Sequence, residues 1–159
     1  RKVSSTHVIA TDIDQLALDL VETSADEQNL RGRHPILSTQ IFDLTSEEKL
    51  PDADLYILSD VFETNNIALG AAKHTLRALQ NDKHVWVFAQ SDRAQRDMYR
   101  GEVLTLISEL LECQNPDDED GDLELMSLLQ HELHWRETYP KSINGKFWLC
   151  DVDELSVLY

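Results

Sequence analysis

Short runs of apolar residues that lack polar alternation constrain the fold of this chain more than any other feature. Three stand out by their β-branched or aromatic content: HVIATD at 7–12, DLYILSD at 54–60 and HVWVFAQ at 84–90. A strand that is covered on both faces needs no polar side, so such runs are typical of parallel sheets. A shorter run, ILSTQIFD at 36–43, follows the break at Pro35 and predicts a further strand.

Helical spacing occupies the chain between and after these runs. Asp14 can cap a helix N-terminus, and Leu16, Leu20 and Val21 follow it at helical intervals. Residues 67–79 repeat this pattern, and residues 103–111 form the clearest amphipathic stripe. We therefore predict a helix after the first strand, one after the third and one after the fourth.

The C-terminal part has a different pattern. Segments 132–139 and 146–152 flank Asn144-Gly145, which is a strong signal for a tight turn, so we expect an antiparallel hairpin. Together the elements predict an α/β, Rossmann-like fold: an open twisted sheet in three layers, mostly parallel, with a C-terminal antiparallel hairpin. No internal repeat or low-complexity linker interrupts residues 1–159, so we expect a single domain.

The charge balance restricts the partners. The formal net charge is −16, from 30 acidic and 14 basic side chains, and it would repel a nucleic acid backbone or an anionic membrane surface. The chain has no apolar stretch of membrane-spanning length and no secretory signal, so we expect a soluble, cytoplasmic protein. Cys113 and Cys150 are too few for a disulfide framework and lack metal-binding spacing.

Three predicted strands end on a carboxylate, at Asp12, Asp43 and Asp60. In open α/β sheets the carboxyl ends of the strands bind ligands, so we expect these acids to share one edge. A carboxylate can accept hydrogen bonds from both hydroxyls of a ribose, and we assign that role to Asp12. Asp14 is better suited to cap the following helix. The alternative is that both acids only solubilise a turn.

The residues around these acids resemble a known family. ATDIDQLALDLVETSADEQN at 10–29 resembles the segment after the glycine loop of class I S-adenosylmethionine methyltransferases, which have seven strands. DLYILSDVFETNNIALGAAKHTLRAL and HVWVFAQSDR resemble their fourth and fifth strands with the helix between them. The nearest group contains protein-lysine methyltransferases and nicotinamide N-methylase-like proteins. The resemblance runs from about residue 8 to residue 93.

The resemblance implies a donor-binding site for S-adenosyl-L-methionine. By the matching motif, Asp12 binds the ribose, Ile13 lies against the adenine, and Asp43 holds the adenine amino group. Ser59 and Asp60 match the fourth-strand motif that lines the methionine end and the acceptor pocket.

The acceptor side of the motif is less complete. Phe62 is expected to wall the acceptor pocket, and Glu63 stands where the family has a tyrosine. If the acceptor is a lysine, Asp60 or Glu63 can orient its neutral amine or help take its proton. Glu63 can equally be a helix N-terminal acid that the helix dipole favours.

The glycine loop of this family is absent. No two of the five glycines have the spacing of G-x-G; they are Gly32, Gly70, Gly101, Gly121 and Gly145. The first strand and its loop should precede the run at 7–12, and that strand normally lies between the strands that end here at Asp12 and Asp60. We expect a missing N-terminal segment of the same protein to complete the sheet, because unpaired apolar edges are unfavourable. The alternative is that another segment fills the gap.

Three functions remain in competition. The first is S-adenosylmethionine-dependent methyl transfer to a protein side chain such as lysine. The second is a catalytically inactive, methyltransferase-like scaffold or assembly factor, which the Glu63 departure favours. The third is a nicotinamide-dinucleotide dehydrogenase, since Asp12 suits that ribose too, although SDVFE and the predicted hairpin argue against it. We expect no metal, because His131 and His134 would point to opposite faces of a strand.

Overall fold

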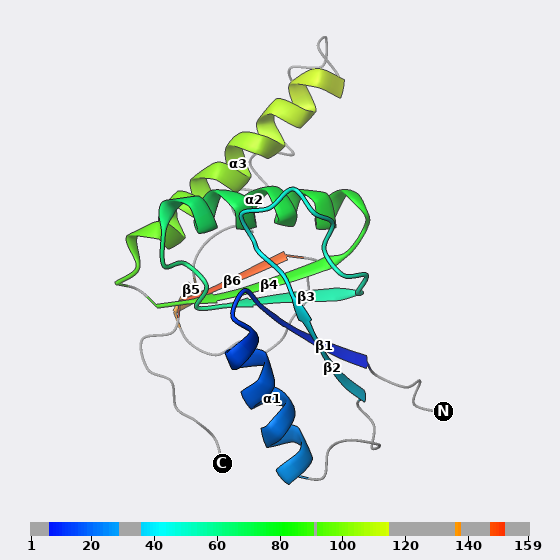
Figure 1. Ribbon diagram of the computed structural model, residues 1–159. Helices are drawn as coiled ribbons and strands as arrows, with labels where there is room; N and C mark the ends of the chain where they lie inside the picture. The colour runs from blue at the N-terminus through cyan, green and yellow to red at the C-terminus, as the bar shows by residue number, and fades with distance from the viewer. Residues whose placement is uncertain (1–6, 29–35, 91, 115–135, 138–146, 152–159) are drawn as a thin grey trace. The chain divides into compact units, whose positions relative to one another are not determined.

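The computed structural model describes residues 7–28, 36–90, 92–114, 136–137 and 147–151, which form a mixed α/β structure (Figure 1). The chain divides into two compact units, Arg1–Pro51 and Asp52–Tyr159. The α/β class and the parallel strand pairing are confirmed. The single-domain arrangement stays a prediction.

The first unit is a strand, a helix and a parallel strand. β1 (His7–Asp12) pairs in parallel with β2 (Ile36–Ile41), and α1 (Gln15–Glu27) packs on both strands. The predicted cap is confirmed, because the Asp14 carboxylate accepts a hydrogen bond from the Leu16 N–H at 2.9 Å. Leu18 and Ala25 are the buried residues of α1.

The second unit contains the remaining elements. They are β3 (Leu55–Ser59), α2 (Asn65–Gln80), β4 (His84–Ala89), α3 (Ala94–Gln114), β5 (Arg136–Glu137) and β6 (Phe147–Asp151). The strands form one sheet in the order β3-β4-β6-β5, in which every pair is parallel. Thr64 caps α2, since its hydroxyl accepts a hydrogen bond from the Ile67 N–H at 3.3 Å.

The core of the second unit lies between β4, α2 and α3. Alternate residues of β4 are buried, and α2 contributes mostly alanines, which let its backbone approach its neighbours closely. Tyr99 of α3 is fully buried, and its hydroxyl hydrogen-bonds to that of Thr75 at 2.8 Å. Burial raises the pKa of Tyr99 well above its ordinary value, so its hydroxyl stays protonated.

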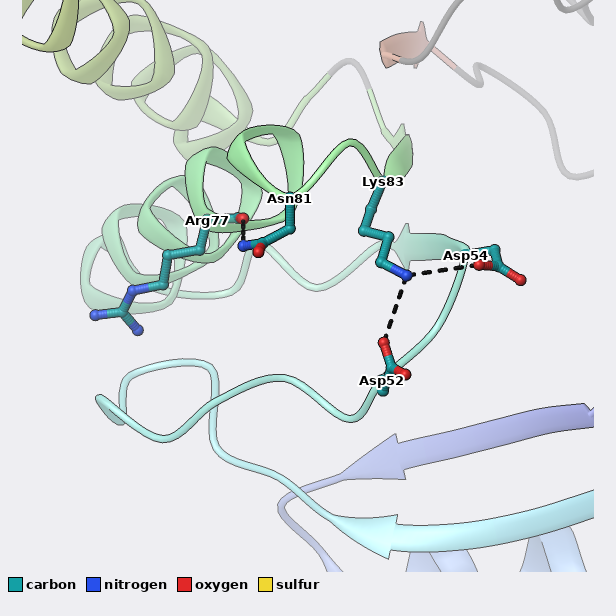
Figure 2. A network of polar contacts seen from close by, with 5 residues as sticks. All are labelled: Asp52, Asp54, Arg77, Asn81 and Lys83. Carbon is teal, nitrogen blue, oxygen red and sulfur yellow. Dashed lines mark hydrogen bonds and ion pairs between the residues drawn. The ribbon is translucent and has the colours of Figure 1, made fainter.

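Charged side chains hold the amino ends of β3 and β4 (Figure 2). Lys83 lies 3.4 Å from a carboxylate oxygen of Asp52 and 3.5 Å from one of Asp54. Partial burial lowers the pKa of Lys83, but the two carboxylates outweigh it and the pKa is raised. The Asn81 side chain donates to the Arg77 carbonyl at 2.7 Å, where α2 ends.

The predicted strands and helices agree closely with the structure. β1, β2, β3 and β4 lie within the four predicted runs. The three predicted helices are α1, α2 and α3, but α3 begins at Ala94 rather than at Val103. Its first turns carry Arg96, Asp97 and Arg100, which hide the helical pattern from a reading of apolar residues alone.

The predicted C-terminal antiparallel hairpin is wrong. β6 runs parallel to β4, with Val85 opposite Phe147, and β5 runs parallel to β6, with Arg136 opposite Cys150. A tight-turn signal is local, whereas strand direction depends on the neighbour with which a strand pairs. The segment FWLCD is apolar without alternation, which is typical of a parallel strand. One argument against a dehydrogenase is therefore lost.

The described strands form two sheets, whereas a single open sheet is predicted. Within the described residues, β1 pairs with β2 alone and β3 pairs with β4 alone. Both strands carry exposed apolar side chains, since Val8 is 42 % and Ile57 56 % exposed. Among the helices of the described ranges, none has both the length and the apolar character needed to cross a membrane.

Candidate functional site

Asp12 stands at the carboxyl edge of the first unit, as the last residue of β1. Its carboxylate oxygen Oδ1 accepts a hydrogen bond from the Asp14 N–H at 2.8 Å, and its backbone carbonyl accepts one from Phe42 N–H at 3.0 Å. The first bond fixes the carboxylate against the turn that starts α1. An ionised carboxylate has about four lone-pair positions, so it retains capacity for further donors.

Ile13 occupies the turn between β1 and the cap of α1. Its side chain is 66 % exposed, although the hydrogen bond between Asp14 N–H and the Asp12 carboxylate fixes the turn that carries it. Ile13 is not part of α1, because Asp14 is the N-cap and Ile13 precedes it. An apolar side chain in this position can lie against a flat ring next to Asp12.

Asp43 lies at the same edge as Asp12. The parallel register places Asp12 opposite Ile41, and Asp43 follows the end of β2 by two residues. Its Oδ1 accepts hydrogen bonds from the Thr45 N–H at 2.7 Å and the Thr45 hydroxyl at 2.8 Å. The backbone bond, then the hydroxyl bond, hold the pKa of Asp43 below its ordinary value of 3.8. This acid is therefore charged at neutral pH.

Asp60 stands at the carboxyl edge of the second unit with an unusual backbone. It directly follows β3 and has a φ of 50°, in the left-handed region that few residues other than glycine, asparagine and aspartate adopt. Its N–H donates to the Phe88 carbonyl at 2.8 Å. Its Oδ2 accepts from the Gln90 amide at 3.3 Å, and its Oδ1 lies 3.6 Å from Nε of Arg93. The carboxylate is thus directed to the turn after β4.

The remaining predicted residues of the second unit differ in their surroundings. Ser59 and Glu63 are exposed, and Glu63 directly precedes the cap of α2 at Thr64. Phe62 is 0 % exposed, and its ring centroid lies 4.9 Å from that of Tyr99. Phe62 therefore belongs to the core of this unit, and its role as a wall of the acceptor pocket stays a prediction.

Gln90 and Arg93 are the residues that the sequence analysis missed. They come from the turn between β4 and α3 and hold the Asp60 carboxylate. One signal was available for Gln90. The run HVWVFAQ ends on this residue, and adjacent parallel strands place their ends together, so Asp60 and Gln90 could have been paired. Nothing in the sequence indicates the left-handed backbone of Asp60.

The seven predicted residues fall into two groups by unit. The first unit brings together Asp12, Ile13 and Asp43, and the second carries Ser59, Asp60, Phe62 and Glu63. The first group can accept hydrogen bonds and contact an apolar ring, which suits a nucleoside. In the described part of the chain, no three metal-binding side chains gather into a possible ion site. His131 and His134 lie outside the described residues.

Comparisons with known proteins provide no further guidance. No protein-family model matches the chain, and neither a curated protein nor a solved structure matches it.

Proposed function

We propose that this chain is part of an S-adenosyl-L-methionine-dependent methyltransferase that modifies a protein side chain such as lysine. One observation carries the proposal. In the parallel β1-α1-β2 unit, Asp12 ends β1 and Asp43 follows the end of β2 by two residues, and the exposed Ile13 stands beside Asp12. This arrangement supports the ribose and adenine roles that the sequence resemblance implies.

The donor-binding roles follow from the chemistry of each side chain. Asp12 accepts hydrogen bonds from the two ribose hydroxyls, while its existing bond to Asp14 N–H fixes the carboxylate in place. Ile13 covers one face of the adenine. Asp43 accepts a hydrogen bond from the adenine amino group, and its lowered pKa keeps it an acceptor at neutral pH.

The acceptor roles belong to the second unit. Bound S-adenosyl-L-methionine supplies an activated methyl group, so the protein needs only to align an acceptor and exclude water. Ser59 and Asp60 line the methionine end, and Phe62 supports the acceptor pocket from the core. Asp60 is held by Gln90 and Arg93, so it acts as a positioning group, while the exposed Glu63 is the better candidate to accept a proton from a lysine amine.

We further propose that additional strands pair with the open edges of β1 and of β3. Each of these strands has an unpaired edge among the described residues and an exposed apolar side chain. Pairing would satisfy the exposed backbone groups at both edges. A cytoplasmic setting and a cationic protein substrate suit the net charge of −16, whereas nucleic acid and membrane surfaces do not.

Calorimetry with S-adenosylhomocysteine tests the donor site. We expect the unaltered protein to bind S-adenosylhomocysteine. Asp12→Asn should bind it at least tenfold more weakly, because asparagine is neutral and has only one oxygen to accept hydrogen bonds from the two ribose hydroxyls. Asp82→Asn is the matched control, because it also removes one carboxylate, just before the amino end of β4. Asp82 has a φ of 61°, which asparagine tolerates.

The alternative function is a methyltransferase-like scaffold or assembly factor that lacks donor binding. The ion pair that occupies Asp60 favours it, as does the absence of G-x-G spacing. Failure of the unaltered protein to bind S-adenosylhomocysteine would support this alternative. Donor binding without methylation of any protein substrate would leave the donor site intact and contradict the acceptor roles of Asp60 and Glu63.

A further inference from the structure

Helix α1 is apolar on two opposite faces, although β1 and β2 cover only one of them. Leu18 and Ala25 are 2 % and 3 % exposed and form the covered face. Leu16 and Leu20 lie about 160° around the helix from Leu18, because each residue turns the helix by about 100°. They are 64 % and 61 % exposed. A surface helix normally needs one apolar stripe, so the second requires another explanation.

The segment that carries this second stripe is acidic. Residues 7–28 contain no lysine or arginine and six carboxylates: Asp12, Asp14, Asp19, Glu22, Asp26 and Glu27. Asp19 and Asp26 are seven residues apart and therefore lie along one flank of the leucines. Glu27 lies in line with the leucines at the C-terminal end of α1. We call Leu16, Leu20, Asp19 and Asp26 the outer stripe.

The acids at the end of α1 do not favour the helix itself. A helix C-terminus carries a partial negative charge, so Asp26 and Glu27 are unfavourable in the last turn of α1, and that turn itself contains no basic residue. Their charge is complementary to a cationic partner. A second copy of α1 would instead bring acid against acid, and an anionic membrane would be repelled.

We propose that the outer stripe docks a basic amphipathic helix of another protein. Apolar side chains of that helix, spaced three or four residues apart, pack against Leu16 and Leu20. Its lysines or arginines face Asp19 and Asp26, which fix its register and speed its association. The outer stripe shares no residue with the proposed donor site, whose residues in the first unit are Asp12, Ile13 and Asp43.

Binding of a designed helical peptide tests the proposal. The probe has leucines at helical spacing flanked by lysines, and a scrambled peptide of the same composition has the same charge without the stripe. We expect Leu16→Gln with Leu20→Gln to weaken binding at least tenfold, since glutamine keeps the helix propensity of leucine but removes the apolar contact. Asp19→Asn with Asp26→Asn should weaken binding several-fold at low salt and reduce its salt dependence. Met98→Gln, at an exposed methionine of α3, is the matched control and should change nothing.

Several results would overturn the proposal. They are equal affinity for the scrambled peptide, indifference to the leucine substitutions, and no binding tighter than about 1 mM. Self-association that the same leucine substitutions abolish would identify a second copy as the occupant instead. A marked loss of stability in the leucine variant would show that the chain already covers these side chains, because truly exposed substitutions change stability by only a small amount.

Discussion

At the scale of single residues, Asp60 combines a left-handed backbone with an ion pair to Arg93. Its φ of 50° is accessible to asparagine and glycine but costs other residues about 1 to 2 kcal/mol. We expect Asp60→Ala to be destabilised by about this amount relative to Asp60→Gly, measured by denaturant unfolding. Asp60→Asn should keep the backbone and lose only the ion pair with Arg93. Equal stability of the alanine and glycine variants would show that the backbone relaxes without strain.

The buried pair of hydroxyls on Tyr99 and Thr75 predicts an asymmetric effect of substitution. Thr75→Val leaves the fully buried Tyr99 hydroxyl without its partner, which should cost about 1 to 3 kcal/mol. Tyr99→Phe should cost less, because a helical threonine can turn its hydroxyl to a backbone carbonyl of its own helix. Unfolding free energies of the two single variants and the double variant measure the coupling. Equal losses for the two single variants would contradict this view of the pair.

The lowered pKa of Asp43 makes the stability of the folded protein depend on pH in the acid range. Hydrogen bonds from the Thr45 N–H and hydroxyl lower its pKa, so the charged form is favoured in the folded state. The stability that this provides is present above the unfolded value of 3.8 and is lost as the pH falls through the lower folded value. NMR titration should place the Asp43 pKa below 3.8 in the wild type. Thr45→Ala should raise it while keeping the backbone bond, and an unchanged pKa would contradict the hydroxyl contribution.

At the scale of elements, α3 contains a glycine that its surroundings do not require. A Cβ at Gly101 would meet no atom within 4 Å. Glycine inside a helix is less favourable than alanine by about 0.5 to 1 kcal/mol, so Gly101→Ala should stabilise the protein by a similar amount. Thermal unfolding measures the gain. A loss of stability would contradict this, because it would mean that the added Cβ clashes with a neighbouring group.

Local signals predicted most elements, and non-local ones were missed. The apolar runs located β1 to β4, and Asp14 correctly predicted the start of α1, because a cap depends on its immediate neighbours. The direction of β6 could not be predicted from Asn144-Gly145, since pairing with β4 depends on distant residues. The Asp60 contact with Arg93 also joins residues from different loops, so it has no local signature.

At the scale of the whole molecule, the division into two units limits what each can stabilise. All strand pairings among the described residues lie within one unit or the other. The first unit spans only Arg1–Pro51, and a chain of this size buries a small core. Exposed apolar residues on β1, β2 and α1 add to this weakness, since they contribute little until something covers them. We therefore expect the first unit to be the less stable one.

Hydrogen exchange of backbone amides tests this expectation. Leu18→Ala and Ile107→Ala each remove a buried aliphatic side chain, at a cost of about 2 to 5 kcal/mol, in the first and second unit respectively. If the units open separately, Leu18→Ala lowers protection in β1, α1 and β2 alone, and Ile107→Ala lowers it in the elements of the second unit alone, among them β3, α2, β4 and α3. Loss of protection throughout the chain in either variant would instead indicate one cooperative unit.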